Sequence, residues 1–164
     1  MEIRPVTPAD ISAILEIYND VVAKTTAIYS DTPYDLSDMQ DYIESRLADN
    51  FPFFIAEDES QIIGYGTYGT FRSRHGYRFT VEHSVHVAEA ARGKGVGKAL
   101  LTHLIHHAKS HDYHLMIGAI DKDNIGSIRF HEQHGFKIVG DIPEAAYKFD
   151  RWLTLIFMSL KLTK

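Results

Sequence analysis

A basic, glycine-rich turn at residues 92–98, with the sequence Arg-Gly-Lys-Gly-Val-Gly-Lys, constrains this chain more than any other stretch. It follows a segment at 78–87 that is rich in β-branched and aromatic side chains, which predicts a strand. Apolar residues then recur at helical spacing, at Val96, Leu100, Leu104 and Ala108. Glycines let backbone N–H groups turn toward a ligand, and the N-terminus of a helix attracts anions. The turn therefore predicts a phosphate or pyrophosphate site between a strand and a helix.

Two common phosphate-binding motifs do not fit this turn. The dinucleotide fingerprint G-x-G-x-x-G requires a glycine where Lys98 stands. The P-loop requires Ser or Thr after its lysine, but Ala99 follows Lys98 and has no hydroxyl for magnesium. A plain strand-to-helix connection with solvated lysines is the structural alternative.

Length and composition limit the classes of protein that this chain can be. Its 164 residues fit one domain, expected over 1–164, with ordinary contents of 45% hydrophobic and 24% charged residues. The absence of cysteine excludes disulfides, thiolate metal sites and a cysteine nucleophile. A net charge of −5 argues against nonspecific nucleic-acid binding. No signal region or membrane-length apolar run is present, so no membrane partner and a cytoplasmic location are expected.

The hydrophobic pattern predicts seven strands and four helices in one α/β (α+β) domain. Strands are expected at 1–4, 53–57, 62–71, 77–87, 114–120, 136–139 and 148–160. Helices are expected at 8–23, 37–48, 95–109 and 124–134. The predicted helix caps are Thr7 with Asp10, Ser37 with Gln40, and Asp123. Loops at 24–35, 72–77 and 140–148 are expected to form the walls of an acceptor pocket.

A second motif narrows the interpretation. From Asn124 to Phe136 the chain fits N-x-x-[AS]-x-x-[LF]-[YH]-x-x-x-G-F, and 92–97 fits R/Q-x-x-G-x-G/A. Both motifs, in this order, resemble the GNAT superfamily of N-acetyltransferases. Segments 25–29, 80–85 and 148–153 further resemble the phosphinothricin and methionine sulfoximine N-acetyltransferases, and the likeness extends from Ile3 to Leu162. Without that likeness, each motif alone could be an ordinary capped helix or glycine turn.

The resemblance implies a GNAT-type mixed, mostly antiparallel sheet and acetyl-CoA as cosubstrate, without a metal. It also implies a homodimer that acetylates the α-amine of a small amino acid of the methionine sulfoximine, methionine sulfone or phosphinothricin type. The residues implied for cofactor binding are Val85, His86, Val87, Arg92, Gly93, Lys94, Gly95, Val96, Gly97, Lys98, Asn124 and Ser127.

Two residues are candidates for catalysis. Glu82 is expected to be the base that neutralises the attacking amine, directly or through water, although it could be a solvent-exposed strand carboxylate or a salt-bridge partner. His131 stands where many members of the superfamily carry a tyrosine thought to protonate the leaving thiolate. It could equally pack near the cofactor.

An amino-acid acceptor calls for arginines and small hydrogen-bond donors. The acceptor-binding candidates are Arg72, Arg74, Glu82, His83, Ser84, Thr26 and Tyr29. Two alternatives stay open: another amine (a protein N-terminus, a polyamine or an aminoglycoside), or a non-catalytic acetyl-CoA-binding module. Methionine sulfoximine or sulfone is preferred over phosphinothricin on overall similarity.

Two further clusters of residues have structural rather than functional explanations. His103, His107 and His111 fall on one helix face, but no carboxylate cluster accompanies them, so no metal site is expected. The aromatic stripe from Tyr147 to Phe157, with Trp152, is expected to be core or dimer interface.

Overall fold

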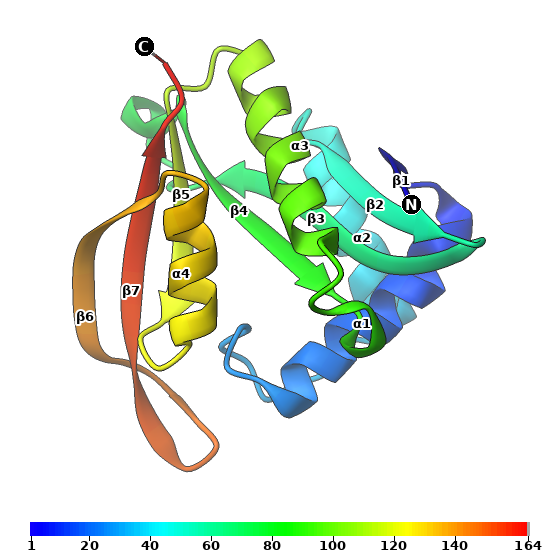
Figure 1. Cartoon of the computed structure of the whole chain (residues 1–164), viewed down its shortest axis with the longest axis horizontal. Coiled ribbons are helices and arrows are strands. Elements are labelled where there is room, and N and C mark those ends of the chain that lie inside the picture. Colours follow the sequence, from blue (N-terminus) through cyan, green and yellow to red (C-terminus); the bar gives the residue numbers. More distant parts are fainter. Residues whose placement is uncertain (164) are drawn as a thin grey trace.

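The computed structural model describes residues 1–163, in which one seven-stranded sheet has the order β1-β2-β3-β4-β5-β7-β6 (Figure 1). The strands are β1 (Glu2–Pro5), β2 (Phe53–Asp58), β3 (Gln61–Thr70), β4 (Thr80–Val87), β5 (Leu115–Asp121), β6 (Lys137–Lys148) and β7 (Arg151–Lys161). The helices are α1 (Ile11–Lys24), α2 (Leu36–Ala48), α3 (Val96–Ser110) and α4 (Ile125–Gln133). The predicted order of helices and strands is confirmed, and so is the mixed, mostly antiparallel sheet.

Helices cover both faces of the sheet, as the alternation of side chains in β2 shows. Phe53 and Ile55 belong to the core cluster that α1 and α2 form on one face. Their neighbours Phe54 and Ala56 point the other way and belong to the cluster beneath α3. Because β2 is buried on both faces, its sequence is a continuous apolar run rather than an alternating one.

The helix caps differ from the predictions at two of three places. Thr7 does cap the first helical turn, and its backbone N–H donates to the Asp10 carboxylate at 2.7 Å. The cap of α2 is Asp35 rather than Ser37, because the Asp35 carboxylate accepts from the Asp38 backbone N–H at 2.8 Å. The cap of α4 is Asn124 rather than Asp123.

Strand β6 is the largest departure from the predicted boundaries. The sequence predicts a strand at 136–139 and a loop at 140–148, whereas β6 runs without interruption to Lys148. Irregular register around Ile138–Gly140 and Ile142–Ala146 breaks the alternation on which the prediction depended. Phe149 and Asp150, with φ of 52° and 57°, form a two-residue hairpin turn into β7. The strand predicted at 148–160 therefore begins at residue 151.

Strands β4 and β5 separate partway along their length, and this separation creates the site. They are the only parallel neighbours within the described sheet, and their pairing ends at Glu82 opposite Ile117. Residues 83–87 of β4 continue to pair with β3 but no longer with β5. Their backbone groups on the β5 side are therefore available to a ligand. The predicted strand at 77–87 begins at Thr80, because residues 75–77 form a 3₁₀ turn.

Candidate active site

A cavity of about 390 Å³ opens where β4 and β5 separate. Four parts of the chain line it: the segment after α1, the second half of β4, the end of β5 with the start of α4, and β7. Ten predicted site residues meet in this cavity: Thr26, Tyr29, Glu82, His83, Ser84, Val85, His86, Asn124, Ser127 and His131. Residues from opposite ends of the sequence therefore share one concave site, which is the usual form of an active site.

Glu82 lies at the point where the two strands part, half-buried at the last β4–β5 rung. Burial raises the pKa of its carboxyl group, and the nearby guanidinium groups of Arg46 and Arg72 oppose that shift. A carboxylate with a raised pKa is a better proton acceptor for an ammonium group than an ordinary surface glutamate.

His83 and His131 form a buried pair whose protonation follows from its contacts. His131 Nδ1 lies 2.7 Å from the Ser127 carbonyl oxygen, so this nitrogen must carry a proton and donate it. His131 Nε2 then accepts from His83 Nε2 at 3.1 Å, which leaves His83 Nδ1 buried without a partner. Burial lowers the pKa of His131, and it lowers that of His83 to about 3. Both rings are therefore uncharged near neutral pH.

Gly118 on β5 provides the space for this histidine pair. A Cβ atom at position 118 would lie 3.2 Å from ring atoms of both His131 and His83. Such contacts are tighter than ordinary van der Waals distances, so a side chain there would have to displace the rings.

The glycine-rich turn has the geometry that an anion site requires. Gly93 and Gly95 have φ of 75° and 83°, and a Cβ atom at either position would meet open space. Gly95 is also the N-cap of α3, so the unpaired N–H groups of the first helical turn face the same side as the turn. Gly97 lies against Phe130 and Val87, which joins the turn to α4 and β4.

Several predicted cofactor-binding residues lie in the cavity or beside the glycine-rich turn. Val85 and His86 line the cavity, Val87 contacts the turn, and Gly95 and Lys98 line a shallow hollow on α3 of about 320 Å³. Asn124 Oδ1 accepts from the Ser127 backbone N–H at 3.0 Å, which caps α4 beside the cavity. These residues fit a long ligand with an anionic middle and an arm that pairs with β4.

Some predicted acceptor residues and walls lie elsewhere. Arg72 and Arg74 are exposed on the segment between β3 and β4 and do not line the cavity, so their role stays a prediction. Of the three predicted loop walls, only 24–35 contributes, through Thr26–Tyr29. Residues 140–148 do not contribute because they are an edge strand of the sheet.

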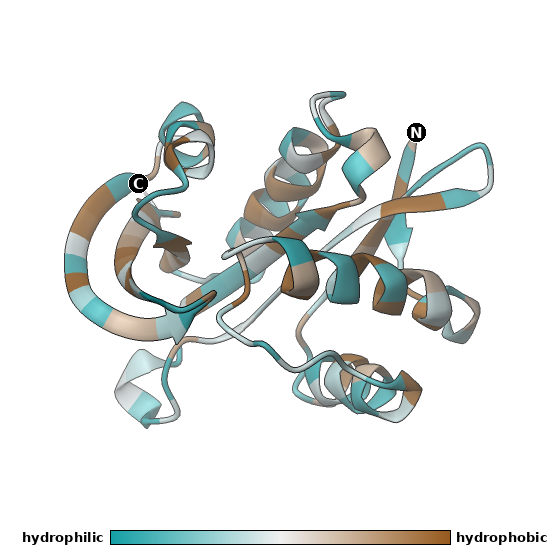
Figure 2. Cartoon of the chain, turned by 90° about the horizontal axis from the view of Figure 1, so that it is seen from below, coloured by the Kyte–Doolittle hydropathy of each residue, from teal (hydrophilic) through white to brown (hydrophobic). Residues whose placement is uncertain are grey.

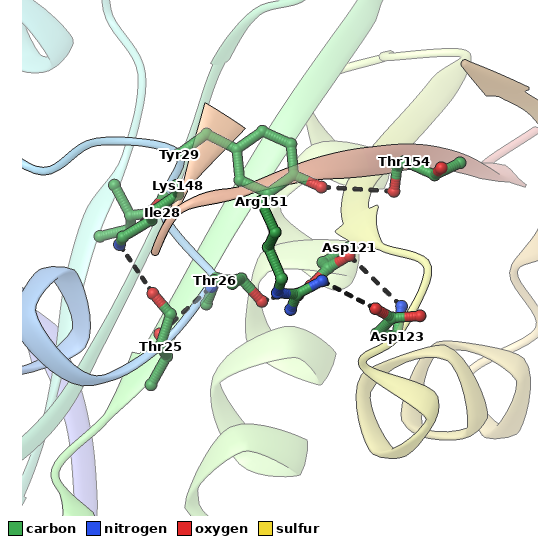
Figure 3. Close-up of polar contacts among 10 residues, drawn as sticks. Thr25, Thr26, Ile28, Tyr29, Asp121, Asp123, Lys148, Arg151 and Thr154 are labelled. Carbon is green, nitrogen blue, oxygen red and sulfur yellow. Dashed lines mark hydrogen bonds and ion pairs between the residues drawn. The ribbon is translucent and has the colours of Figure 1, made fainter. Parts of the chain in front are cut away.

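Asp121 is a cavity residue that the sequence analysis missed. It ends β5, is 3% exposed, and its carboxylate accepts from the Thr26 hydroxyl (Figure 3). Arg151 Nη2 lies 3.7 Å from Asp121, and Arg151 Nη1 donates to Asp123 at 2.9 Å. The only sign in the sequence that Asp121 lies near the site is its position three residues before Asn124. Nothing in the sequence indicates that Asp121 contacts Thr26.

Two absences concern the described residues alone. Residues 1–163 contain no group of three or more histidine or acidic side chains positioned to hold a metal ion. Across the same range, no helix combines the length and the apolarity needed to cross a membrane.

Comparison with known proteins decides the family. A family model described as the acetyltransferase (GNAT) family matches residues 14–136. The chain belongs to the GNAT acetyltransferase family. As a GNAT enzyme it is an acetyl-CoA-dependent N-acetyltransferase, and acetyl-CoA supplies the activated acetyl group as a thioester.

Individual GNAT relatives cover nearly the whole chain. An L-methionine sulfoximine/L-methionine sulfone acetyltransferase from Pseudomonas aeruginosa is 44% identical over 98% of this chain and 94% of that protein. A phosphinothricin N-acetyltransferase from Streptomyces viridochromogenes is 32% identical over 93% of this chain and 82% of that protein.

Solved GNAT structures superpose closely on the fold. A ribosomal-protein-alanine N-acetyltransferase from Brucella melitensis has a TM-score of 0.97 and 42% identity, covering 98% of this chain and 99% of that one. A phosphinothricin acetyltransferase from Sinorhizobium meliloti in complex with acetyl-CoA has a TM-score of 0.95 and 34% identity, covering 98% of this chain and 87% of that one.

Proposed function

We propose that this GNAT enzyme acetylates the α-amine of a small amino acid of the methionine sulfoximine or methionine sulfone type. The observation that carries the proposal is the cavity between β4 and β5, which places Glu82 beside backbone groups that the sheet leaves unpaired. Its volume of about 390 Å³ suits a small acceptor and the reacting end of a cosubstrate. The 44% identical sulfoximine/sulfone acetyltransferase supports this acceptor class over phosphinothricin, whose acetyltransferase is 32% identical.

Glu82 removes the proton from the acceptor ammonium, directly or through one water. An amine attacks a carbonyl carbon only when its lone pair is free, so proton removal must precede attack. Backbone N–H groups in 85–87, which have lost β5 as a partner, stabilise the negative charge that develops on the carbonyl oxygen. The Asn124 side chain lies across the cavity and contacts the arm of the cosubstrate.

His131 acts in this scheme as an uncharged ring. Its Nδ1 proton is engaged by the Ser127 carbonyl, and its Nε2 accepts from His83. Neither uncharged ring can give up a proton without becoming an imidazolate. His131 would protonate the departing thiolate only after gaining a proton at Nε2, such as the one that Glu82 removes from the amine; otherwise the thiolate leaves unprotonated. Gly93, Gly95 and the cations of the turn hold the pyrophosphate.

The acceptor is held by charge on both of its ends. Glu82 and Asp121 give the cavity two carboxyl groups, which favour an ammonium group there. Thr26, Tyr29 and Ser84 supply hydroxyl groups at the wall. Arg72 and Arg74 lie on the segment leading into β4 and would receive the acceptor carboxylate. Replacing either should raise the KM for the acceptor and leave that for acetyl-CoA unchanged.

We also propose that the enzyme is a homodimer and that residues 1–164 form one catalytic domain. Large apolar side chains are exposed along the outer hairpin, which shows as brown segments on β6 in Figure 2. They include Ile138, Val139, Ile142, Tyr147 and Trp152, with exposed fractions of 45–62%. Several large apolar side chains exposed on one hairpin are typical of a subunit interface. The cytoplasmic location stays a prediction.

Steady-state kinetics with a free-thiol readout tests the acceptor. Methionine sulfone and methionine sulfoximine should give a kcat/KM at least about tenfold above that of phosphinothricin, as expected for a pocket that discriminates by shape and hydrogen bonding. An alanine-terminated peptide, a polyamine and an aminoglycoside complete the panel. Preference for the peptide would instead favour a protein N-terminus, as the name of the Brucella neighbour suggests. If the protein binds acetyl-CoA but releases no thiol with any amine, the result would favour a non-catalytic acetyl-CoA-binding module.

A further inference from the structure

The β6–β7 hairpin presents two cations to the segment that walls the cavity. Lys148 and Arg151 are the last cross-strand pair of the hairpin, on either side of the two-residue turn. Directly opposite residues of two strands project from the same face of a sheet. Figure 3 shows both side chains reaching from the hairpin toward the chain around Thr25–Tyr29.

Lys148 is buried and fully engaged by backbone oxygens. Its side chain is 1% exposed, and Nζ donates to the carbonyl groups of Val22 at 2.7 Å, Thr25 at 2.7 Å and Ile28 at 2.8 Å. Three donors thus meet three acceptors, which satisfies the ammonium group completely. Val22 lies in the last turn of α1 and Thr25 follows the helix directly, so the cation also compensates the negative end of the helix dipole.

Arg151 acts on the same segment through Asp121. Its guanidinium group lies 3.7 Å from the Asp121 carboxylate, which accepts from the Thr26 hydroxyl. The Tyr29 hydroxyl donates to the Thr154 carbonyl oxygen at 3.4 Å, again on β7. The long-range hydrogen bonds of Thr26, Ile28 and Tyr29 therefore lead to the hairpin or to the end of β5, although Lys148 and Arg151 do not themselves line the cavity.

We propose that Lys148 and Arg151 are positioning residues that hold Thr26–Tyr29 in place as the acceptor wall and so set the affinity for the acceptor. The inference builds on the proposed amino-acid acetylation and names the elements that shape its pocket. Neither residue contacts the glycine-rich turn. The affinity for the acceptor should therefore change in these variants without a matching change in the affinity for acetyl-CoA.

Two variants and one control test the proposal. Lys148→Met removes the three hydrogen bonds but keeps most of the apolar stem. Arg151→Gln removes the cation beside Asp121 at a half-exposed position, where folding tolerates substitution. Lys137→Met changes an exposed lysine at the start of the same strand and serves as control. The first two should raise the acceptor KM at least about fivefold and change the acetyl-CoA KM much less, because Thr26–Tyr29 line the cavity and not the hollow beside the glycine-rich turn.

Hydrogen exchange of the amides of residues 26–29 provides a readout independent of activity. Exchange there should be faster in Lys148→Met and Arg151→Gln than in wild type and Lys137→Met. Unchanged exchange and unchanged acceptor KM in the folded variants would overturn the proposal. If Lys148→Met does not fold, an unchanged exchange rate in Arg151→Gln is by itself enough to overturn the proposal. If wild type acetylates no amino acid, the proposed function fails while the exchange measurement still decides whether the hairpin holds this wall.

Discussion

Glu82 lies directly opposite Gly69 in the β3–β4 pairing, and the Arg46 guanidinium occupies the space that a side chain at position 69 would fill. A glycine at this place therefore lets a cation from α2 lie close to the candidate base. Arg46 is one of two guanidinium groups that lower the pKa of Glu82 against the larger effect of burial. The sequence gives no sign of this neighbour, since α2 and β4 are far apart along the chain.

Replacing Glu82 by Gln should reduce kcat by about 10²-fold or more, because the amide cannot accept the ammonium proton. The acidic limb of the pH profile, which reports deprotonation of Glu82, should disappear or move. Rates measured over a range of pH quantify both effects. The control variant is Glu132→Gln, because Glu132 is an exposed glutamate on α4. An unchanged profile would remove Glu82 from the role of base.

Arg46→Met should move the acidic limb of kcat/KM to higher pH. The cation stabilises the ionised form of Glu82, so its removal raises the pKa of a group that is already raised by burial. Activity at pH 6 should then fall more than activity at pH 8. Equal losses at both pH values would show that Arg46 acts on something other than the ionisation of Glu82.

His131→Phe should lower kcat while the affinity for acetyl-CoA stays close to wild type. The phenyl ring fills the buried site but cannot accept the proton that His83 donates. Single-turnover rates and equilibrium binding of acetyl-CoA separate the two quantities. Loss of binding with an unchanged rate would favour a packing role for this ring.

Gly118→Ala should disturb the histidine pair without a change in any charge. The new methyl group would press on both rings at 3.2 Å, so we expect a loss of about 1–3 kcal/mol in the free energy of unfolding and a fall in kcat. Gly76→Ala is the matched control, because a Cβ atom there meets nothing within 4 Å. Denaturant unfolding of both variants checks the first effect, and wild-type stability of Gly118→Ala would contradict it.

The protein should lose stability as the pH falls below about 6.5. The unfolded chain protonates His83 near 6.5, whereas the folded protein does so only near 3. Between these values the unfolded state binds the additional proton, so the free energy of unfolding decreases by up to about 1.4 kcal/mol per pH unit for this group. Urea unfolding between pH 7 and 5 should show a smaller slope against pH in His83→Gln than in wild type.

The order of elements and most of the cavity were predictable because they depend on local patterns. The turn at 92–98, the strand leading to it and the motif from Asn124 to Phe136 are each readable within about a dozen residues, although the cap of α4 was placed one residue too early. Asp121 and Lys148 were not readable in this way because their partners Thr26 and Val22 lie 95 and 126 residues away, and Arg151 was not because its partner Asp121 lies at the end of another strand. The extent of β6 was missed since its bulges hide the period of two.

The hydrogen bond between Lys148 and Val22 spans 126 residues of sequence. Helix α1 and the segment after it are made early in synthesis, but their anchor belongs to the last hairpin of the chain. A contact of such high sequence separation forms only after the intervening sheet has brought its ends together. The acceptor wall is therefore among the last parts of the enzyme to assemble, and a truncated or nascent chain would carry a complete glycine-rich turn long before it could select an amine.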